Sequence, residues 1–192
     1  MKPRLVMIGS IFAILGLFVT GNTYAQTKIT RPKAGLPYKI TTSGSYFLAA
    51  NLSVSTKTTT AILVKSNNVT INLNGFVISG IGGNSTGVGI DASAVTGVTI
   101  ANGTITGFGT GIKLNSTSTV EGVQIYNNNG DGIATSGSSC FVSNSVITGN
   151  SGSGLDFSDA TSGYLSNVLN NSSNVINGTN MGNNVCSGTI CP

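Results

Sequence analysis

Histidine and tryptophan are absent from this 192-residue chain, and only 7% of its residues are charged. Without histidine, the chain has no imidazole to serve as a general base or a metal ligand. A polar, weakly charged composition can indicate disorder. Here, however, Ile, Val and Leu recur at ordered intervals between turn-forming Gly, Asn and Ser, which is typical of an all-β protein.

The few charges are unevenly distributed. Between Gln26 and Lys65 the chain has no acid, and from Ser66 onward it has a single base, Lys113. A basic end could bind acidic glycans or lipid headgroups. We favour the simpler interpretation that lysines keep a terminal cap soluble and block edge pairing, and we expect no nucleic-acid partner. The bases are Lys28, Arg31, Lys33, Lys39, Lys57 and Lys65, and the acids are Asp91, Glu121, Asp131, Asp156 and Asp159.

Cysteine is scarce, with three residues in the chain. Cys186 and Cys191 are close enough to close a small loop, and a disulfide between them is expected in an oxidising compartment. Cys140 is then unpaired, and we expect it to be buried as a small apolar side chain. Three cysteines without histidine make a poor metal site, so we predict neither a metal nor a cofactor.

The start of the chain, 1–25, has the pattern of a signal peptide. Lys2 and Arg4 precede the apolar run Leu5–Val19, and small residues at 23 and 25 mark a cleavage site after Ala25. An uncleaved anchor is the alternative, but this run is shorter than the roughly 20 residues that span a bilayer. No later segment is apolar enough to span, so we predict a secreted protein, extracellular or periplasmic.

A repeat dominates the remaining chain. The motif Gly-x-Gly-aliphatic ends at Ile90, Ile112, Ile133 and Leu155, and one further period reaches Ile176. A near-constant period of this length indicates a solenoid whose coils stack to bury their apolar side. We predict a right-handed parallel β-helix with coils of about 21–22 residues.

Three further columns keep this register. Gly107, Asn128, Asn150 and Asn171 stand five positions before the aliphatics, and the three Asn side chains are expected to form a hydrogen-bonded structural ladder. Thr104, Ile125, Ile147 and Val168 stand eight positions before them. The residues directly after the aliphatics are mostly polar, so they should face outward: Asp91, Lys113, Ala134, Asp156 and Asn177.

Two other repeat classes fit less well. Leucine-rich repeats have a similar period but need several leucines per repeat. Calcium-binding nonapeptide repeats need recurring Gly-Gly-x-Gly-x-Asp, which only Gly130-Asp131-Gly132 approaches. We therefore divide the chain into a signal peptide (1–25), an N-terminal cap with an entry strand pair (26–60), the coils (61–180) and a C-terminal cap with the disulfide (181–192).

Four segments carry a resemblance to known proteins: Ser43–Val54, Asn67–Gly80, Val98–Leu114 and Asn183–Pro192. They resemble secreted bacterial right-handed β-helix proteins of the pectin lyase-like superfamily. That superfamily includes polysaccharide lyases, which use an Arg, Lys or Tyr base, and hydrolases with Asn-Thr-Asp, Asp-Asp and Gly-His-Gly motifs. This chain has none of those motifs and no Arg after Arg31, so no catalytic residue can be carried over.

The outward column supplies a candidate binding face, formed by Asp91, Lys113 and Asp156. Asp91 and Lys113 are expected on adjacent coils, where a surface ion pair is the simpler interpretation. Tyr126 and Tyr164 could stack on a sugar ring, although packing is the simpler role for each.

Two functions follow from these residues. We favour a non-catalytic secreted module of the cell surface or matrix that binds polysaccharide or a cell-surface glycan. The alternative is a small polysaccharide lyase or glycoside hydrolase, which rests on the likeness of fold. Ice binding would need a long Thr-x-Thr array, which the chain lacks. The sequence leaves the ligand and the oligomeric state open.

The signal-peptide pattern predicts where the mature chain begins. Because Ala25 is the last small residue before the polar chain, we expect cleavage there and Gln26 as the first mature residue. The intact mass of protein recovered outside the cells tests this. A mass that retains the segment 1–25 would indicate an anchored protein instead.

Overall fold

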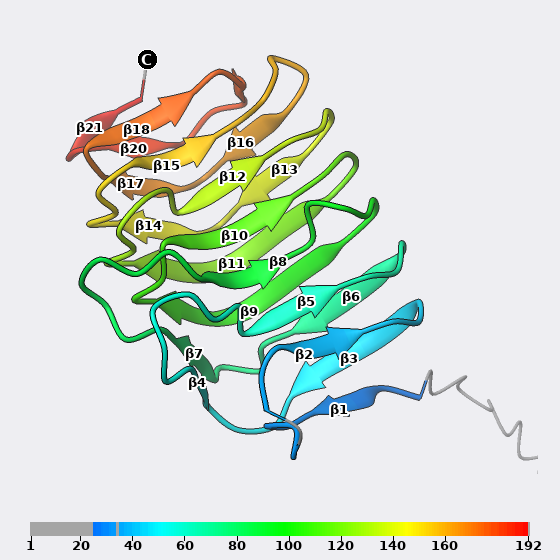
Figure 1. Cartoon of the computed structure of the whole chain (residues 1–192). Coiled ribbons are helices and arrows are strands. Elements are labelled where there is room, and N and C mark those ends of the chain that lie inside the picture. Colours follow the sequence, from blue (N-terminus) through cyan, green and yellow to red (C-terminus); the bar gives the residue numbers. More distant parts are fainter. Residues whose placement is uncertain (1–24, 34, 192) are drawn as a thin grey trace, which may run out of the picture.

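The computed structural model describes residues 25–33 and 35–191, which form an all-β parallel solenoid of about seven turns (Figure 1). The predicted signal peptide, apart from Ala25, lies outside the described residues. Strands from successive turns stack into three faces along the solenoid. Parallel crossovers are right-handed in nearly all proteins, and right-handedness stays a prediction for this chain.

The first face is a separate sheet of seven parallel strands. It contains β2 (Tyr38–Ile40), β5 (Ile62–Val64), β8 (Val88–Asp91), β10 (Thr110–Leu114), β12 (Ile133–Thr135), β15 (Ser153–Asp156) and β18 (Ser173–Ile176). The Gly-x-Gly-aliphatic motifs enter this face, and each aliphatic is an inward residue of its strand.

The second and third faces form one continuous sheet, because β9 (Thr99–Thr106) and β11 (Thr119–Tyr126) run through both. The second face also contains β1 (Thr27–Ile29), β3 (Gly44–Leu48), β6 (Val69–Asn72), β13 (Phe141–Ser143), β16 (Gly163–Leu165) and β19 (Thr179–Asn180). The third face also contains β4 (Leu52–Ser53), β7 (Val77–Ser79), β14 (Val146–Thr148), β17 (Val168–Asn170), β20 (Val185–Cys186) and β21 (Thr189–Ile190).

The corner between the second and third faces needs left-handed backbone on successive turns. The residues that occupy it are Asn102, Gly122, Asn144 and Ser166, with φ between 52° and 62°. Their neighbours Ala101, Glu121, Ser143 and Leu165 are register partners. Gly and Asn tolerate this conformation best, which explains why a chain so rich in both residues can turn so sharply in every coil.

Inward columns of aliphatic side chains from all three faces form the core. On the first face, Ile90, Ile112, Ile133 and Leu155 are register partners and fully buried. Each side chain is covered by the equivalent side chains of the turns on either side. One turn alone could not bury these residues, so the hydrophobic contribution to folding comes from stacking.

The column predicted eight positions before the aliphatics is wrong at its two ends. The structure pairs Ile125 and Ile147 with Ile105 and Leu169, which are buried. Thr104 and Val168 instead belong to the neighbouring outward column. At the first end, the step from Ile105 to Ile125 is shorter than the step from Ile125 to Ile147. At the last end, the step from Ile147 to Leu169 keeps its full length, whereas the first-face step from Leu155 is shorter. A constant offset from the aliphatics therefore misses the inward residue by one position.

The last repeat is also shorter than predicted. Leu155 pairs with Val175, and Ile176 pairs with Asp156 and is 42% exposed. Ile176, not Asn177, therefore ends the outward column. On the third face, Thr148 and Asn170 are still separated by the full length of a turn. The missing residues of this repeat are therefore lost at the corner that follows β17.

The N-terminal segment, which is predicted to be a cap, contributes strands to the solenoid stack. β1 stacks on β3, and β2 stacks on β5, both in parallel register. The predicted entry strand pair does not form, since β3 pairs with β1 and β6 whereas β4 pairs with β7. These short strands are adjacent in the chain, which suggests a pair, yet they lie on different faces.

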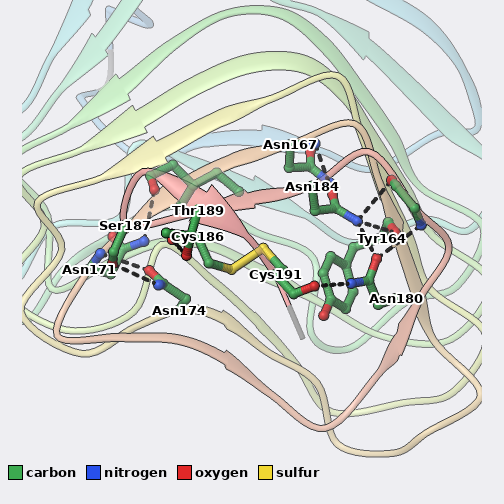
Figure 2. The surroundings of a disulfide bond; sticks show 12 residues. Tyr164, Asn167, Asn171, Asn174, Asn180, Asn184, Cys186, Ser187, Thr189 and Cys191 are labelled. Atoms are coloured by element: carbon green, nitrogen blue, oxygen red, sulfur yellow. Dashed lines mark hydrogen bonds between the residues drawn. A yellow bond between two sulfur atoms is a disulfide. The ribbon is translucent and has the colours of Figure 1, made fainter.

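The C-terminal turn ends in a hairpin closed by a disulfide. β20 stacks in parallel on β17 and pairs in antiparallel register with β21. Cys186 and Cys191 are bonded (Figure 2), which confirms the predicted disulfide. Cys140 is free and buried, and burial raises the pKa of its thiol.

The predicted asparagine ladder is present as a continuous series of hydrogen bonds. The side-chain amide of Asn128 donates to Asn150 Oδ1 at 2.9 Å, and that of Asn150 donates to Asn171 Oδ1 at 2.8 Å. Backbone amides of Asn128 and Asn150 donate to the same oxygens. Gly107 is not a rung, because the amide of Phe108 donates to Asn128 Oδ1.

A second ladder was not predicted. The amide of Ser145 donates to Asn167 Oδ1 at 3.0 Å, and the backbone and side-chain amides of Asn167 donate to Asn184 Oδ1. Figure 2 shows the Asn167–Asn184 step beside the disulfide. The repeat pattern does not reveal this second ladder, because the column changes from Ser145 to Asn167. In addition, the sequence separation from Asn167 to Asn184 is much shorter than that from Ser145 to Asn167.

Removing the middle rung of the first ladder tests its contribution. Asn150→Ala should lower the free energy of unfolding by about 1–3 kcal/mol, because Asn128 loses its buried acceptor. Chemical denaturation measures this change. The matched control is the exposed Asn170, where Asn170→Ala should change stability by less than ~0.5 kcal/mol. Equal effects of the two substitutions would show that the ladder adds nothing.

Candidate functional site

The outward column of the first face brings the three predicted binding residues into one line. Asp91 is the register partner of Lys113, Lys113 that of Ala134, and Ala134 that of Asp156. Neighbouring strands lie about 4.8 Å apart. The line therefore presents a carboxylate, an ammonium group, a methyl group and a second carboxylate on successive turns.

The same line continues toward the N-terminus. Asp91 pairs with Leu63, and Leu63 pairs with Lys39. Neither residue was predicted for this column, because the first turns depart from the regular spacing of the motif. The face therefore carries two cations, and Lys113 is the one that lies among the regular turns.

A shallow hollow of about 280 Å³ lies beside the line at Ala134. Ala134 is small, which leaves space next to the Lys113 side chain of the preceding turn. Hydroxyl-bearing side chains complete the lining. The lining residues are Ser93, Lys113, Leu114, Ala134, Thr135 and Ser136.

The carboxylate of Asp91 is occupied within its own turn. It accepts hydrogen bonds from the backbone amide of Ser93 at 3.1 Å and from Ser93 Oγ at 2.7 Å. Within the described residues, no ion pair joins Asp91 to Lys113, so the predicted surface ion pair is not formed. The Asp-x-Ser sequence competes for the carboxylate through a local Asx turn, and this leaves the Lys113 ammonium available to a ligand.

The hydroxyl groups of the hollow use their hydrogens internally. Ser93 Oγ donates to Asp91, Ser136 Oγ donates to the carbonyl of Leu114 at 3.2 Å, and Thr135 Oγ1 donates to the carbonyl of Gly137 at 3.4 Å. Thr135 Oγ1 also accepts from the backbone amide of Ser158 at 3.1 Å. Ser93 Oγ and Ser136 Oγ can still accept hydrogen bonds from a ligand. The hollow therefore offers hydroxyl acceptors and one cation to a ligand. Apart from Thr135, these hydroxyls fall just beyond their strands, outside the columns that the sequence pattern singles out.

The carboxyl group of Asp156 is partly buried. Burial, followed by the charge of Asp131, raises the pKa of the Asp156 carboxyl above its ordinary value. Asp131 itself accepts a hydrogen bond from the backbone amide of Ser153 on the next turn, at 2.7 Å. Asp156 is therefore more easily protonated than a fully solvated carboxyl.

The geometry does not assemble a carboxylate pair for glycoside hydrolysis. Asp91 and Asp156 are three strand spacings apart, about 14 Å along the column, whereas such pairs lie within about 9.5 Å. Of the tyrosines, Tyr164 is buried and its ring lies 6.3 Å from that of Phe157. Tyr126 lies on the third face, so neither tyrosine belongs to this hollow.

Known proteins supply no further guide to the site. Comparisons with protein families, curated proteins and solved structures find no match to this chain. Among residues 25–33 and 35–191, no group of three potential metal ligands is found, and no helix could cross a membrane.

The raised pKa of Asp156 predicts a pH dependence of stability. Because the folded protein favours the protonated carboxyl, stability is lost as the pH rises from the ordinary value, 3.8, through the raised folded pKa. Asp156→Asn removes this loss. We expect the variant to gain stability relative to wild type as the pH rises from below the titration window to neutrality.

Urea denaturation at a series of pH values from about 3 to 7 measures the difference. The control is Glu121→Gln, which changes an exposed carboxyl on the second face. Parallel pH profiles of the wild-type protein and the Asp156→Asn variant would contradict the predicted role of burial.

Proposed function

We propose that this chain is a secreted, non-catalytic module that binds polysaccharide along its first face. The observation that carries the proposal is the Lys113 ammonium group, free of Asp91 and placed beside a hydroxyl-lined hollow. A cation among hydrogen-bond acceptors suits a sugar polymer that carries both carboxylate and hydroxyl groups.

The direction of the line supports an extended ligand. Outward side chains repeat once per turn along the solenoid, about 4.8 Å apart, and three of the four from Asp91 to Asp156 are charged. A polysaccharide lying parallel to the solenoid axis could therefore contact successive turns with successive sugars. Flat faces of this kind bind through many weak contacts along one chain.

Secretion is consistent with the Cys186–Cys191 disulfide, since disulfides persist in oxidising compartments. The non-catalytic assignment rests on chemistry. Proton abstraction beside a carboxylate needs a positioned base together with a group that neutralises the carboxylate. Lys113 lies between Asp91 and Ala134 on the adjacent turns, and Lys39 is three strand spacings away, about 14 Å. One cation would therefore have to perform both roles.

Binding assays on pectate, alginate and chondroitin test the proposal, together with a glycan array on the mature protein. We expect binding without unsaturated or hydrolysed product. Lys113→Ala should weaken binding about tenfold or more, since a charge-assisted hydrogen bond contributes about 1.5–3 kcal/mol. Ala134→Leu should weaken it as well by filling the hollow.

The matched control is Ala101→Leu, which adds the same side chain to an outward position of the second face. Unchanged binding by Lys113→Ala and Ala134→Leu, or no binding to any glycan, would refute the proposal. An active wild type with an inactive Lys113→Ala variant would instead establish the lyase alternative and make the Asp91–Lys113–Asp156 face an active site.

A further inference from the structure

The outward column of the second face is interrupted at one turn. Thr99, Thr119, Phe141, Gly163 and Thr179 are successive register partners. Gly163 has no side chain, so the column has a gap between Phe141 and Thr179. This gap is on a different face from Lys113 and shares no residue with the hollow at Ala134.

The gap is not required by the backbone. Gly163 lies within strand β16, and its φ is outside the left-handed region that favours glycine. A glycine inside a strand weakens the strand and marks a place where another group approaches closely. Here a Cβ would lie 2.7 Å from Met181 Sδ and 3.6 Å from Phe141 Cδ2, so both side chains extend over Gly163.

A hollow of about 300 Å³ lies at this gap. Phe141 and Met181 form its apolar part, and Met181 is 58% exposed. Thr161, Ser162 and Thr179 supply hydroxyl groups around it. The hollow therefore has an apolar floor and a polar rim, which is the arrangement of sites that orient a small ligand.

The rim hydroxyls are already oriented by the protein. Thr161 Oγ1 and Ser162 Oγ donate to the two oxygens of Asp159, at 2.9 and 3.2 Å, and Thr179 Oγ1 donates to the carbonyl of Ala160 at 2.8 Å. Thr161 Oγ1 already accepts from the backbone amide of Ser139, and the buried Ser162 Oγ accepts from that of Cys140, each at 3.1 Å. Thr161 and Thr179 can each still accept a hydrogen bond from a ligand. The rim thus suits a ligand that donates hydrogen bonds, and the Asp159 carboxylate disfavours an anionic one.

We propose that the hollow between Phe141 and Met181 binds one neutral hexose ring of an oligosaccharide. The apolar C–H face of the ring covers Phe141 and Met181, and its hydroxyl groups donate to Thr161 and Thr179. Gly163 makes room for Met181, whose side chain covers it and so lines the hollow next to Phe141. This site is separate from the first face, and it does not depend on the function proposed for Lys113.

Binding is measured with three neutral probes, the hexamers of β-1,4-linked glucose, α-1,4-linked glucose and β-1,4-linked mannose. The methyl resonance of Met181 reports occupancy in the mature protein. We expect at least one hexamer to shift this resonance in a saturable manner. Phe141→Leu, which keeps an apolar side chain but removes the ring, should weaken that binding about tenfold.

Two controls separate the site from other effects. Thr119→Ala lies one turn away in the same column, and Lys113→Ala lies on the first face; both should bind the hexamer as wild type does. Circular dichroism and the melting temperature verify that Phe141→Leu is folded. Met181→Ala provides a second variant if it is not, with titration calorimetry as the readout.

Three results would overturn the proposal. The first is the absence of a saturable shift with any hexamer. The second is wild-type affinity in folded Phe141→Leu or Met181→Ala protein. The third is loss of hexamer binding in Lys113→Ala, which would assign the neutral sugar to the first face. Failure of pectate, alginate and chondroitin to bind would leave this proposal standing, because those tests address the other hollow.

Discussion

Stacking of each turn on the next in parallel register is the constraint on which this molecule depends. A single turn exposes its aliphatic side chains on the two sides that neighbouring turns must cover, and it leaves the backbone hydrogen bonds of its strands unmade. Both needs are met together when Ile90, Ile112 and Ile133 lie in one column. A shift of one residue would turn these side chains outward, so core packing and hydrogen bonding enforce the same alignment.

The corners meet the same constraint with polar groups. Where the chain turns, backbone amides point into the interior, and buried amides need acceptors. Asn128, Asn150 and Asn167 provide those acceptors while donating to neighbouring turns. A ladder of this kind is satisfied along its length only if consecutive turns align, so it adds specificity for the register as well as stability. Within the described residues, no buried side-chain nitrogen or oxygen lacks a hydrogen-bond partner.

A regular stack also determines how binding sites can arise. Outward columns are flat when each turn contributes a side chain of similar size, and a hollow forms where one turn contributes a small one. Ala134 lies at such a place on the first face, and Gly163, covered by Met181, lines the hollow on the second. The two hollows differ in chemistry, since the first has an ammonium group and the second has an aromatic ring beside a carboxylate. An ammonium group favours an acidic sugar, whereas an aromatic ring beside a carboxylate favours a neutral one.

The sequence by itself determined the all-β solenoid, the buried column through Ile90 and Leu155, the ladder from Asn128 to Asn171, and the Cys186–Cys191 disulfide. These features repeat at a near-constant interval or are local in the chain, so the spacing of residue types is enough to identify them. It also identified the line of Asp91, Lys113 and Asp156.

Only the tertiary structure determined the features that depend on how many residues each individual turn contains. It placed Ile105 and Leu169 in the core, turned Ile176 outward, made the N-terminal strands part of the stack, and directed Asp91 to Ser93 in place of Lys113. It likewise set Phe141 and Met181 on either side of Gly163. When one turn has a residue more or less at a corner, the register partners of all later residues shift by one position. The backbone accommodates the change within that corner. The spacing of motifs along the sequence gives only the total length of a turn, so it cannot show which corner has changed.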